Sequence, residues 1–377
     1  MKKHLPLISI FCFVLLALGL LIIYGCGTNP TGGGGPWTLT EIASGTGMGN
    51  PSLAIDSANK PKIAYVGSGK LMYADWTGSK WNISTVEASV SVGSLSLALN
   101  NYGSPEICYY DDTHKDLRYA RFSGTTWETQ LIDDSPYTGI GSAFYSPSLA
   151  FDGSGYPKVC YFDWVNGYLK YAKWNNATST WEPEIVENSG NVTGAPSLII
   201  NSLGRPQISY CDNLDLKHAK WTGATWTKEI VDNGGGGPAL FNHSSITMGS
   251  NEAPMITYID TYYLDLRLAR WNVSQWFPEI VDDGSVDDDY PPSLKHDSDY
   301  NPRIAYIYDN YDNGPDYELK CAVWSGSSWH FEVADNNRYR IMNPSLAIDT
   351  NGKTRIAYVR YSDVSETIGH IMFAARN

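Results

Sequence analysis

The residues best suited to contact a ligand are four aspartates and a group of aromatic residues. Each aspartate stands two positions after a tyrosine that recurs along the chain: Asp111, Asp163, Asp212 and Asp260. The aromatic candidates in the segments that follow such tyrosines are Trp164, Tyr262 and Tyr311. Carboxylates accept hydrogen bonds from sugar hydroxyls or hold a cation, and aromatic faces stack on sugars and proteins. The alternative for the aspartates is structural, since an Asp side chain also caps the turn after it.

Two acidic segments could bind a metal ion. Asp309, Asp312 and Asp316 fall in a stretch with the oxygen density of a Ca²⁺ loop, although it does not match an EF-hand. Asp287-Asp288-Asp289 is a second acidic run. Calcium and a solvated loop both remain open for them. The sequence requires no cofactor, and we assign no catalytic residue, because no Ser-His-Asp set, His-Glu-x-x-His motif or phosphate loop is present.

An internal repeat dominates the chain. Seven repeats begin at Ser52, Ser96, Ser148, Ser197, Ser245, Ser293 and Ser345. In the first repeat Pro61 comes nine residues after Ser52, and Tyr65 comes four residues after Pro61. The other repeats keep both offsets, with Thr354 replacing the proline in the last. Each repeat reads as four strands separated by turns rich in Gly, Ser, Asp and Asn. Four-stranded repeats of this length predict an all-β seven-bladed β-propeller of antiparallel blades.

The last repeat lacks its fourth strand at the C-terminus. Residues 37–42 supply a matching segment at the other end of the chain. We therefore expect this N-terminal strand to close the ring, with Trp37, Leu39 and Ile42 buried. The distance from Trp37 to Ile42 is one residue longer than in most repeats, as it is from Trp81 to Val86, which suggests a β-bulge or a different hairpin.

The repeat, with its Pro-Ser-Leu-Ala and Ile-Ala-Tyr blocks, resembles the propellers of secreted bacterial proteins over residues 37–377. It is more distantly similar to sialidase-type and fucose-binding lectin propellers. Sialidase Asp-boxes lie between the third and fourth strands and end in Trp. Here Asp152-Gly153-Ser154-Gly155 lies between the first and second strands without that Trp, so the resemblance does not extend to sialidase chemistry.

Positions that recur in every blade are expected to build the scaffold. The tyrosines should fill the space between neighbouring blades. The serines should tie the innermost strands together by hydrogen bonds, or else line a polar mouth of the central channel. A ligand site should instead break the sevenfold pattern. The long, varied connections after the second and fourth strands share one face, which we call the long-loop face, and the aspartates stand at its edge. Blades one, six and seven replace the aspartate with Gly67, Tyr308 and Arg360.

The N-terminus is typical of an exported protein. Two lysines precede an apolar stretch that ends at Cys26, and Ile23-Tyr24-Gly25-Cys26 resembles the lipobox of bacterial lipoproteins. The resemblance implies a signal peptide over 1–25, a lipidated Cys26 and a flexible tether over 26–36. An uncleaved anchor is the alternative, since about 20 apolar residues span a bilayer. Gly27 after the cysteine points to the outer membrane in a two-membraned cell.

Charge and fold together limit the function. The net charge of −13 disfavours nucleic acid as a partner. We expect a monomer, held in the cell envelope through the lipid on Cys26, that binds a glycan or a protein on its long-loop face. A structural component of an envelope complex and a glycan-cleaving enzyme are the two alternatives. The ligand itself is not encoded in any motif.

Overall fold

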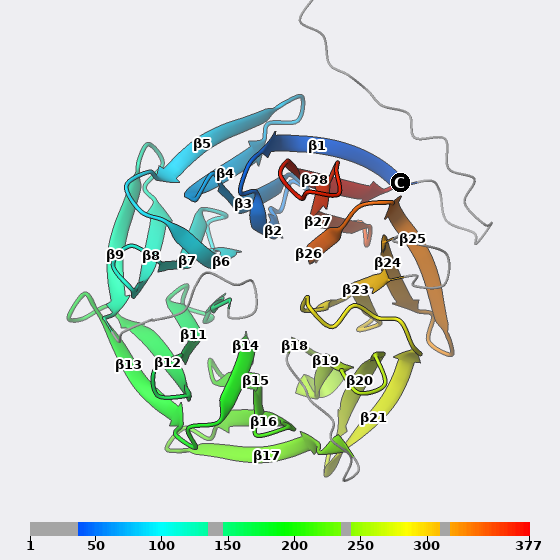
Figure 1. Cartoon of the computed structure of the whole chain (residues 1–377). Helices are drawn as coiled ribbons and strands as arrows, with labels where there is room; N and C mark the ends of the chain where they lie inside the picture. Colours follow the sequence, from blue (N-terminus) through cyan, green and yellow to red (C-terminus); the bar gives the residue numbers. More distant parts are fainter. Residues whose placement is uncertain (1–36, 135–145, 235–242, 310–316) are drawn as a thin grey trace, which may run out of the picture. The chain divides into compact units, whose positions relative to one another are not determined.

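The computed structural model describes residues 37–134, 146–234, 243–309 and 317–377, all in one compact unit, Gly32–Asn377. Seven four-stranded antiparallel sheets form a ring around a central axis (Figure 1). This arrangement confirms the predicted all-β seven-bladed propeller. The expected signal peptide and tether over 1–36, with the lipobox-like segment and Cys26, lie outside the described ranges, as do Tyr311, Asp312 and Asp316.

Each blade is a meander whose strands follow one another from the axis outward. Blade one contains β2 (Gly49–Ile55), β3 (Pro61–Gly67), β4 (Lys70–Trp76) and β5 (Trp81–Glu87). Blade two contains β6 (Val92–Leu99), β7 (Pro105–Asp111), β8 (Asp116–Phe122) and β9 (Trp127–Asp133). Blade three contains β10 (Ser148–Phe151), β11 (Pro157–Asp163), β12 (Tyr168–Asn175) and β13 (Thr180–Glu187). Blade four contains β14 (Val192–Ile200), β15 (Pro206–Asp212), β16 (Asp215–Trp221) and β17 (Trp226–Asp232).

The remaining three blades continue the same order. Blade five contains β18 (Ser244–Met248), β19 (Pro254–Asp260), β20 (Asp265–Asn272) and β21 (Gln275–Asp282). Blade six contains β22 (Ser293–His296), β23 (Pro302–Asp309), β24 (Tyr317–Trp324) and β25 (Trp329–Asn337). Blade seven contains β26 (Ile341–Ile348), β27 (Thr354–Tyr361), β28 (Gly369–Arg376) and β1 (Trp37–Gly45).

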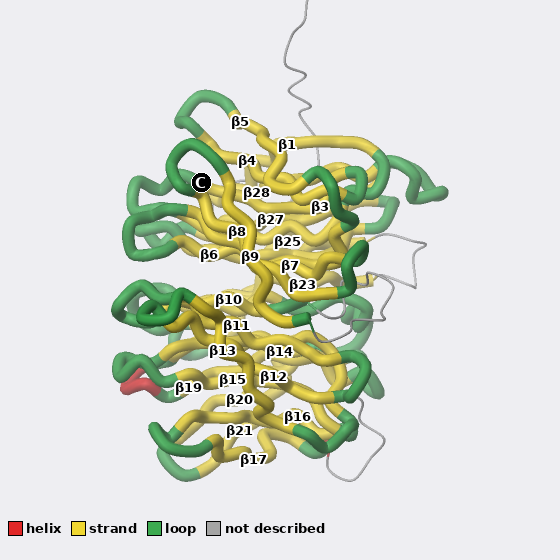
Figure 2. The backbone as a smooth tube through the Cα atoms, turned by 90° about the vertical axis from the view of Figure 1, so that its left-hand side faces the viewer, coloured by secondary structure: helices red, strands yellow, loops and turns green. Residues whose placement is uncertain are grey.

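The connections gather at the two ends of the strands (Figure 2). At one end, tight turns join the first strand to the second, and the 3₁₀ turn Ser250–Glu252 replaces one of them in blade five. In each described blade the recurring proline or threonine opens the second strand, where a missing N–H does least harm. The opposite end is the long-loop face, at which the innermost strands begin.

The recurring serines form a closed set of contacts around the ring. Each serine Oγ accepts a hydrogen bond from the backbone N–H of the residue that follows the serine of the next blade. Leu97 donates to Ser52 at 2.9 Å, and Leu53 donates to Ser345 at 2.9 Å, which closes the circle. The other five contacts span 2.9–3.2 Å. This confirms that the hydroxyls tie the innermost strands of adjacent blades together.

The recurring tyrosines are fully buried between blades, as the repeat predicted. Most of them reach an acidic residue at the end of the preceding blade's fourth strand. Tyr358 donates to Asp335 at 2.7 Å, and Tyr258 donates to Asp232 at 2.6 Å. The same contact joins Tyr306 to Asp282, Tyr210 to Glu187 and Tyr161 to Asp133. A tyrosine hydroxyl therefore links each of these blade pairs in addition to its ring packing.

The N-terminal strand closes the ring. β1 pairs antiparallel with β28, from Trp37 opposite Arg376 to Gly45 opposite Gly369. Ile42 is 8% exposed, as expected, whereas Trp37 is only partly buried. The expectation for Leu39 was wrong, because this side chain is 36% exposed. β1 is the outermost strand of its blade, so alternate residues along it face solvent.

A β-bulge occurs in β1 between Glu41 and Ala43, where Ile42 has no partner on β28. The sequence assigned this irregularity to two repeats only. In the structure the fourth strand of each of the other six blades shows the same shift, and its acidic residue follows the unpaired position: Glu87, Asp133, Glu187, Asp232, Asp282 and Asp335. The bulge turns a small apolar side chain inward next to the acidic residue.

Candidate ligand-binding site

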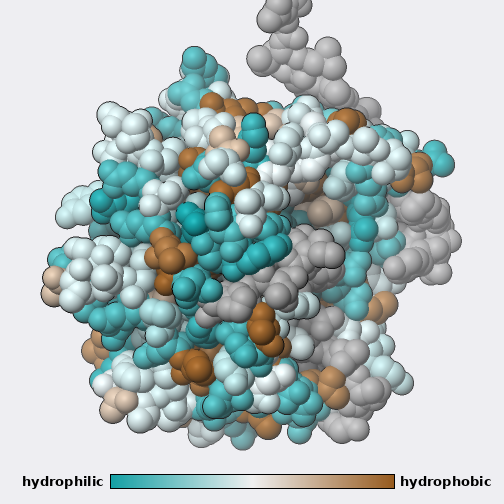
Figure 3. Space-filling model, turned by 60° about the vertical axis from the view of Figure 1, so that its left-hand side comes forward, coloured by the Kyte–Doolittle hydropathy of each residue, from teal (hydrophilic) through white to brown (hydrophobic). Residues whose placement is uncertain are grey.

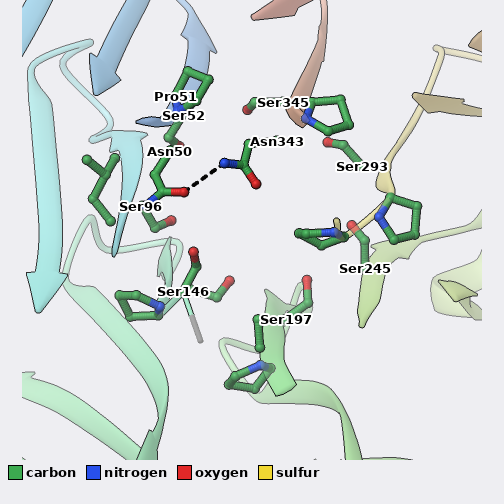
Figure 4. A pocket seen from close by; sticks show the side chains of 18 of the residues that line it. Asn50, Pro51, Ser52, Ser96, Ser146, Ser197, Ser245, Ser293, Asn343 and Ser345 are labelled. Atoms are coloured by element: carbon green, nitrogen blue, oxygen red, sulfur yellow. Dashed lines mark hydrogen bonds between the residues drawn. The ribbon is translucent and has the colours of Figure 1, made fainter. Parts of the chain in front are cut away.

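A pocket opens on the axis at the long-loop end of the innermost strands. Ring geometry places the serines of all seven blades around it, and Figure 4 shows their side chains surrounding one central space. Prolines precede the serine in five blades and make the rim partly apolar: Pro51, Pro147, Pro196, Pro292 and Pro344. The pocket therefore offers short hydroxyls and proline rings in alternation.

The rim is not sevenfold symmetric. Asn50 and Asn343 stand side by side in blades one and seven, and Asn343 Nδ2 donates to Asn50 Oδ1 at 2.9 Å (Figure 4). Asn50 Nδ2 in turn donates to the carbonyl of Gly93 at 2.6 Å. The pocket volume is about 180 Å³, which is below the usual range for a whole small-molecule ligand. It has room for a small group rather than for a whole ligand.

The four candidate aspartates lie at the ends of the second strands and are almost completely buried. Their exposed fractions are 0% for Asp111, 5% for Asp163, and 1% for Asp212 and Asp260. Each is close to a basic residue of the third strand in its own blade. The distance from the basic nitrogen to the carboxylate oxygen is 2.5–3.9 Å in these four ion pairs. They join Asp111 to Arg118, Asp163 to Lys170, Asp212 to Lys217 and Asp260 to Arg267.

Three of these carboxylates also hold the turn after the strand. Asp111 Oδ1 accepts the N–H of Thr113 at 2.8 Å, which is the turn-capping contact that the residue type favours. Asp163 and Asp260 accept backbone N–H groups in the same way. Their position beneath the loops makes these side chains supports for the loop residues above them.

Trp164 stands on one of these supported turns. Asp163 accepts hydrogen bonds from both the backbone N–H and the side-chain amide of Asn166, at 3.2 and 3.0 Å. Gly167 has φ +66°, and a Cβ there would lie 2.5 Å from the carbonyl oxygen of Gly190 in the neighbouring connection, so only glycine fits. Trp164 is 38% exposed and packs edge-on against Phe162. The indole is thus presented on a fixed backbone.

Tyr262 and Tyr263 occupy the corresponding turn of blade five. Asp260 Oδ1 accepts their backbone N–H groups at 3.1 and 3.4 Å. The two rings meet edge-on with centroids 4.7 Å apart, and they are 58% and 60% exposed. The structure therefore places aromatic surface on the long-loop face in blades three and five, while Tyr311 of blade six lies outside the described residues.

The three blades without the aspartate have a different arrangement of charged residues around this position. In blade six, Lys320 Nζ lies 3.2 Å from the ring centroid of Tyr308, a cation–π contact, and also pairs with Asp282 at 3.5 Å. Arg360 instead pairs with Asp335 at 3.3 Å. Blade one carries Gly67 opposite Lys70, and Met72 stands where blades two to six carry the basic residue, as Met372 does in blade seven. In blades one and seven the second-strand acid and the third-strand base are replaced together, which indicates that the pair serves contacts within the blade.

Among the described residues, the acidic run of 287–289 is a group of carboxylates that lie close enough together to share an ion. Arg340 pairs with Asp289 at 2.6 Å, and the Asp289 N–H donates to Asp287. Burial raises the pKa of Asp287 to about 6. Asp309 is buried at the end of β23, where its N–H donates to the carbonyl of Ser285. These carboxylates form an acidic cluster, to which the structure assigns no metal ion.

Exposed apolar side chains are dispersed over the surface. Figure 3 shows them on the face turned to the viewer as separate patches between hydrophilic areas. Within the described part of the chain, no helix is long and apolar enough to cross a membrane. Surface hydrophobicity thus offers no single docking area on this face.

Sequence reasoning missed two features of this site. The first is the pairing of each aspartate with a third-strand base, although Arg118, Lys170, Lys217 and Arg267 recur at one position of the repeat. The second is the acid at the end of the fourth strand, which recurs in six repeats and in five of them bonds the tyrosine of the next blade. Both signals are visible once the repeats are aligned through the third and fourth strands as well as the first two.

No family model matches the chain, and no curated protein matches it in sequence. Similar solved structures are propellers. An ulvan lyase, a polysaccharide lyase seen bound to -[GlcA(1-4)Rha3S]-, has TM-score 0.60 and 14% identity, covering 88% of this chain and 94% of its own. The oligogalacturonate lyase of Vibrio parahaemolyticus has TM-score 0.58 and 11% identity, covering 89% and 93%.

A lectin is also similar. The six-bladed fucose-recognising lectin of Aleuria aurantia has TM-score 0.50 and 13% identity, covering 76% of this chain and 96% of its own. At such identities the likeness concerns the fold alone. The chain therefore has the β-propeller fold, which it shares with this lectin and with the two lyases.

Proposed function

We propose that this protein is a carbohydrate-binding propeller whose ligand lies across the long-loop face. The observation that carries the proposal is the aromatic surface of Trp164 and of the Tyr262–Tyr263 pair, left exposed on turns fixed from beneath. Sugar rings present flat C–H faces that pack on such aromatic surfaces. Rigid turns lower the entropy lost on binding, because the side chains are already in place.

The axial pocket complements these aromatic residues. It opens at the same end of the blades, and its serine and asparagine side chains can exchange hydrogen bonds with sugar hydroxyls. A pocket of about 180 Å³ suits one projecting group of a longer glycan. The ligand class that fits both features is an oligosaccharide rather than a single free sugar.

Removal of the exposed aromatic rings tests the proposal. On a glycan array and in titrations with a glycan found there, we expect Trp164→Ala, and Tyr262→Ala combined with Tyr263→Ala, each to weaken binding about tenfold, roughly 1.4 kcal/mol. Because these side chains are substantially exposed, the free energy of unfolding should change by less than about 1 kcal/mol.

Tyr102 provides the matched control. It is a tyrosine in the tight turn between β6 and β7, at the opposite end of the blades, and it is 93% exposed. Tyr102→Ala should leave glycan binding unchanged. Equal losses from Tyr102→Ala and Trp164→Ala, or a ligand that maps to the tight-turn end, would refute the assignment of the face.

The proposal includes attachment to the cell envelope through Cys26. The lipobox-like tetrapeptide that ends at this cysteine supports it. We expect Cys26→Ala to remain as an uncleaved precursor, or to be released from the membrane, since the thiol that carries the lipid is gone. Intact mass and membrane fractionation measure both outcomes, and a mutant with unchanged mass and partition contradicts the proposed anchor.

A further inference from the structure

Blade six breaks the repeat on its innermost strand. Two positions after the recurring serine, six blades carry an uncharged residue: Ala54, Ala98, Ala150, Ile199, Thr247 and Ala347. Blade six carries Lys295 there, in the middle of β22. β22 pairs only with β23, so its other edge borders the axis of the ring. A charged side chain thus stands where the other blades have none.

Lys295 belongs to a strand that borders the central channel. Its side chain is exposed, although the innermost strand is surrounded by the ring of blades. Desolvation by that surrounding protein lowers the pKa of Lys295. Both observations fit a side chain in the central channel, which protein surrounds and water enters. The residue two positions earlier, Ser293, lines the axial pocket, about 7 Å away along the strand.

A second cation lies directly opposite Lys295. Arg303 on β23 is its cross-strand partner, so both side chains leave the same face of the sheet. Arg303 is 9% exposed and donates to the carbonyl of Gly352 at 2.6 Å and to Thr354 Oγ1 at 2.8 Å. Its Nε–H is buried and has no hydrogen-bond partner among the described residues. Like charges placed opposite each other destabilise a sheet.

The nearby acids do not balance these two cations. Asp297 lies 3.5 Å from Arg303, and the described residues give Lys295 no carboxylate within 4.0 Å. Lys295, Arg303 and Asp297 therefore sum to 2 − 1 = +1. At the three equivalent positions, blades one, three and seven pair one base with one acid, blades four and five are uncharged, and blade two carries Glu106 alone. Blade six has the positive excess.

We propose that the channel holds an anionic group, a carboxylate or a sulfate, against Lys295 and Arg303. An oxyanion there would pair with the Lys295 ammonium, and the unpaired Nε–H of Arg303 would supply a charge-assisted donor beside it. The site lies below the axial pocket, so it accepts either a free anion or the charged substituent of a glycan that occupies the pocket. The anion site does not depend on the proposed stacking on Trp164.

The test is calorimetric titration of the full-length protein in neutral detergent with sodium sulfate, at constant ionic strength. Wild-type protein should bind sulfate saturably, and Lys295→Ala should weaken this binding at least about tenfold. Alanine stands at this position in four blades, so the variant should keep the melting temperature of the wild type. The control Lys80→Ala removes an exposed lysine from the β4–β5 turn and should bind sulfate like wild type.

Oligogalacturonate and its neutral methyl ester distinguish the two sources of the anion. Binding of the acid form more tightly than sulfate, with loss of that advantage in Lys295→Ala, assigns the site to an acidic glycan. Equal affinity for sulfate and oligogalacturonate assigns it to a free anion. Absence of saturable sulfate binding, or wild-type affinity in Lys295→Ala, overturns the proposal. If the proposed stacking is wrong, Trp164→Ala will instead leave the binding of a neutral glycan unchanged.

Discussion

Deletion of residues 36–44 should unfold the propeller or leave it aggregated. The deletion removes nearly all of β1, which pairs with β28 from Trp37 to Gly45 except at the bulge. Burial of Ile42 and of part of Trp37 contributes about 2–3 kcal/mol for each side chain, before ordering costs. The lost strand hydrogen bonds add to this, and the total rivals the roughly 5–15 kcal/mol net stability usual for a domain. Thermal melting and light scattering measure the effect.

Two variants make this experiment specific. Deletion of 27–35 shortens the tether outside β1 and should leave the melting temperature unchanged. Cysteines at Thr38 and Ala375, which face each other in the β1–β28 register, should form a cross-link, because paired strands bring Cβ atoms within about 4.5–5.5 Å. A 36–44 deletion that melts like the intact protein would contradict ring closure by this strand.

Replacement of Tyr358 by alanine should lower the free energy of unfolding by about 3–5 kcal/mol, because loss of a buried aromatic ring leaves a cavity. The side chain is 0% exposed and packs between blades six and seven. Its hydroxyl also donates to Asp335 at 2.7 Å, and Asp335 is 7% exposed. The variant should therefore be far less stable than the Trp164 and Lys295 variants. Chemical denaturation gives the free energy of unfolding directly.

Phenylalanine variants separate the ring from the hydroxyl. Tyr358→Phe keeps the packing but removes a donor from a buried carboxylate, so it should cost about 1–3 kcal/mol. Tyr109→Phe is the control, since the buried Tyr109 hydroxyl has no partner within the described ranges. It should be neutral or slightly stabilising. Equal costs for the two variants would show that the tyrosine–acid contact does not stabilise the blade interface.

The scaffold was predictable because its pattern occurs seven times in the chain. The spacing from Ser52 to Pro61 to Tyr65 recurs without slipping, so strand order, blade number and the closing strand follow from counting. The exposure of Leu39 was not predictable in this way, because the register with β28 decides which face of β1 meets solvent. The recurring β-bulge likewise became apparent only from the pairing of the third and fourth strands.

The candidate site was predictable only in part. The sequence placed Trp164 and Tyr262 on the long-loop face, and the structure leaves both side chains exposed there. It also offered two interpretations of the aspartates, as ligand contacts or as turn caps. Asp163 and Asp260 hold the turns that carry these aromatic residues, a role that depends on the exact course of a short loop.

The sequence by itself determined the class of fold, the number of blades and the way in which the ring closes. These features are periodic and local, so strand and turn preferences repeated along one chain specify them. Only the tertiary structure decided that Asp335 bonds a tyrosine of the next blade, and that Lys295 and Arg303 share one face beside the channel. Such contacts join different strands and blades, and they depend on strand register and on which face of a sheet meets its neighbour.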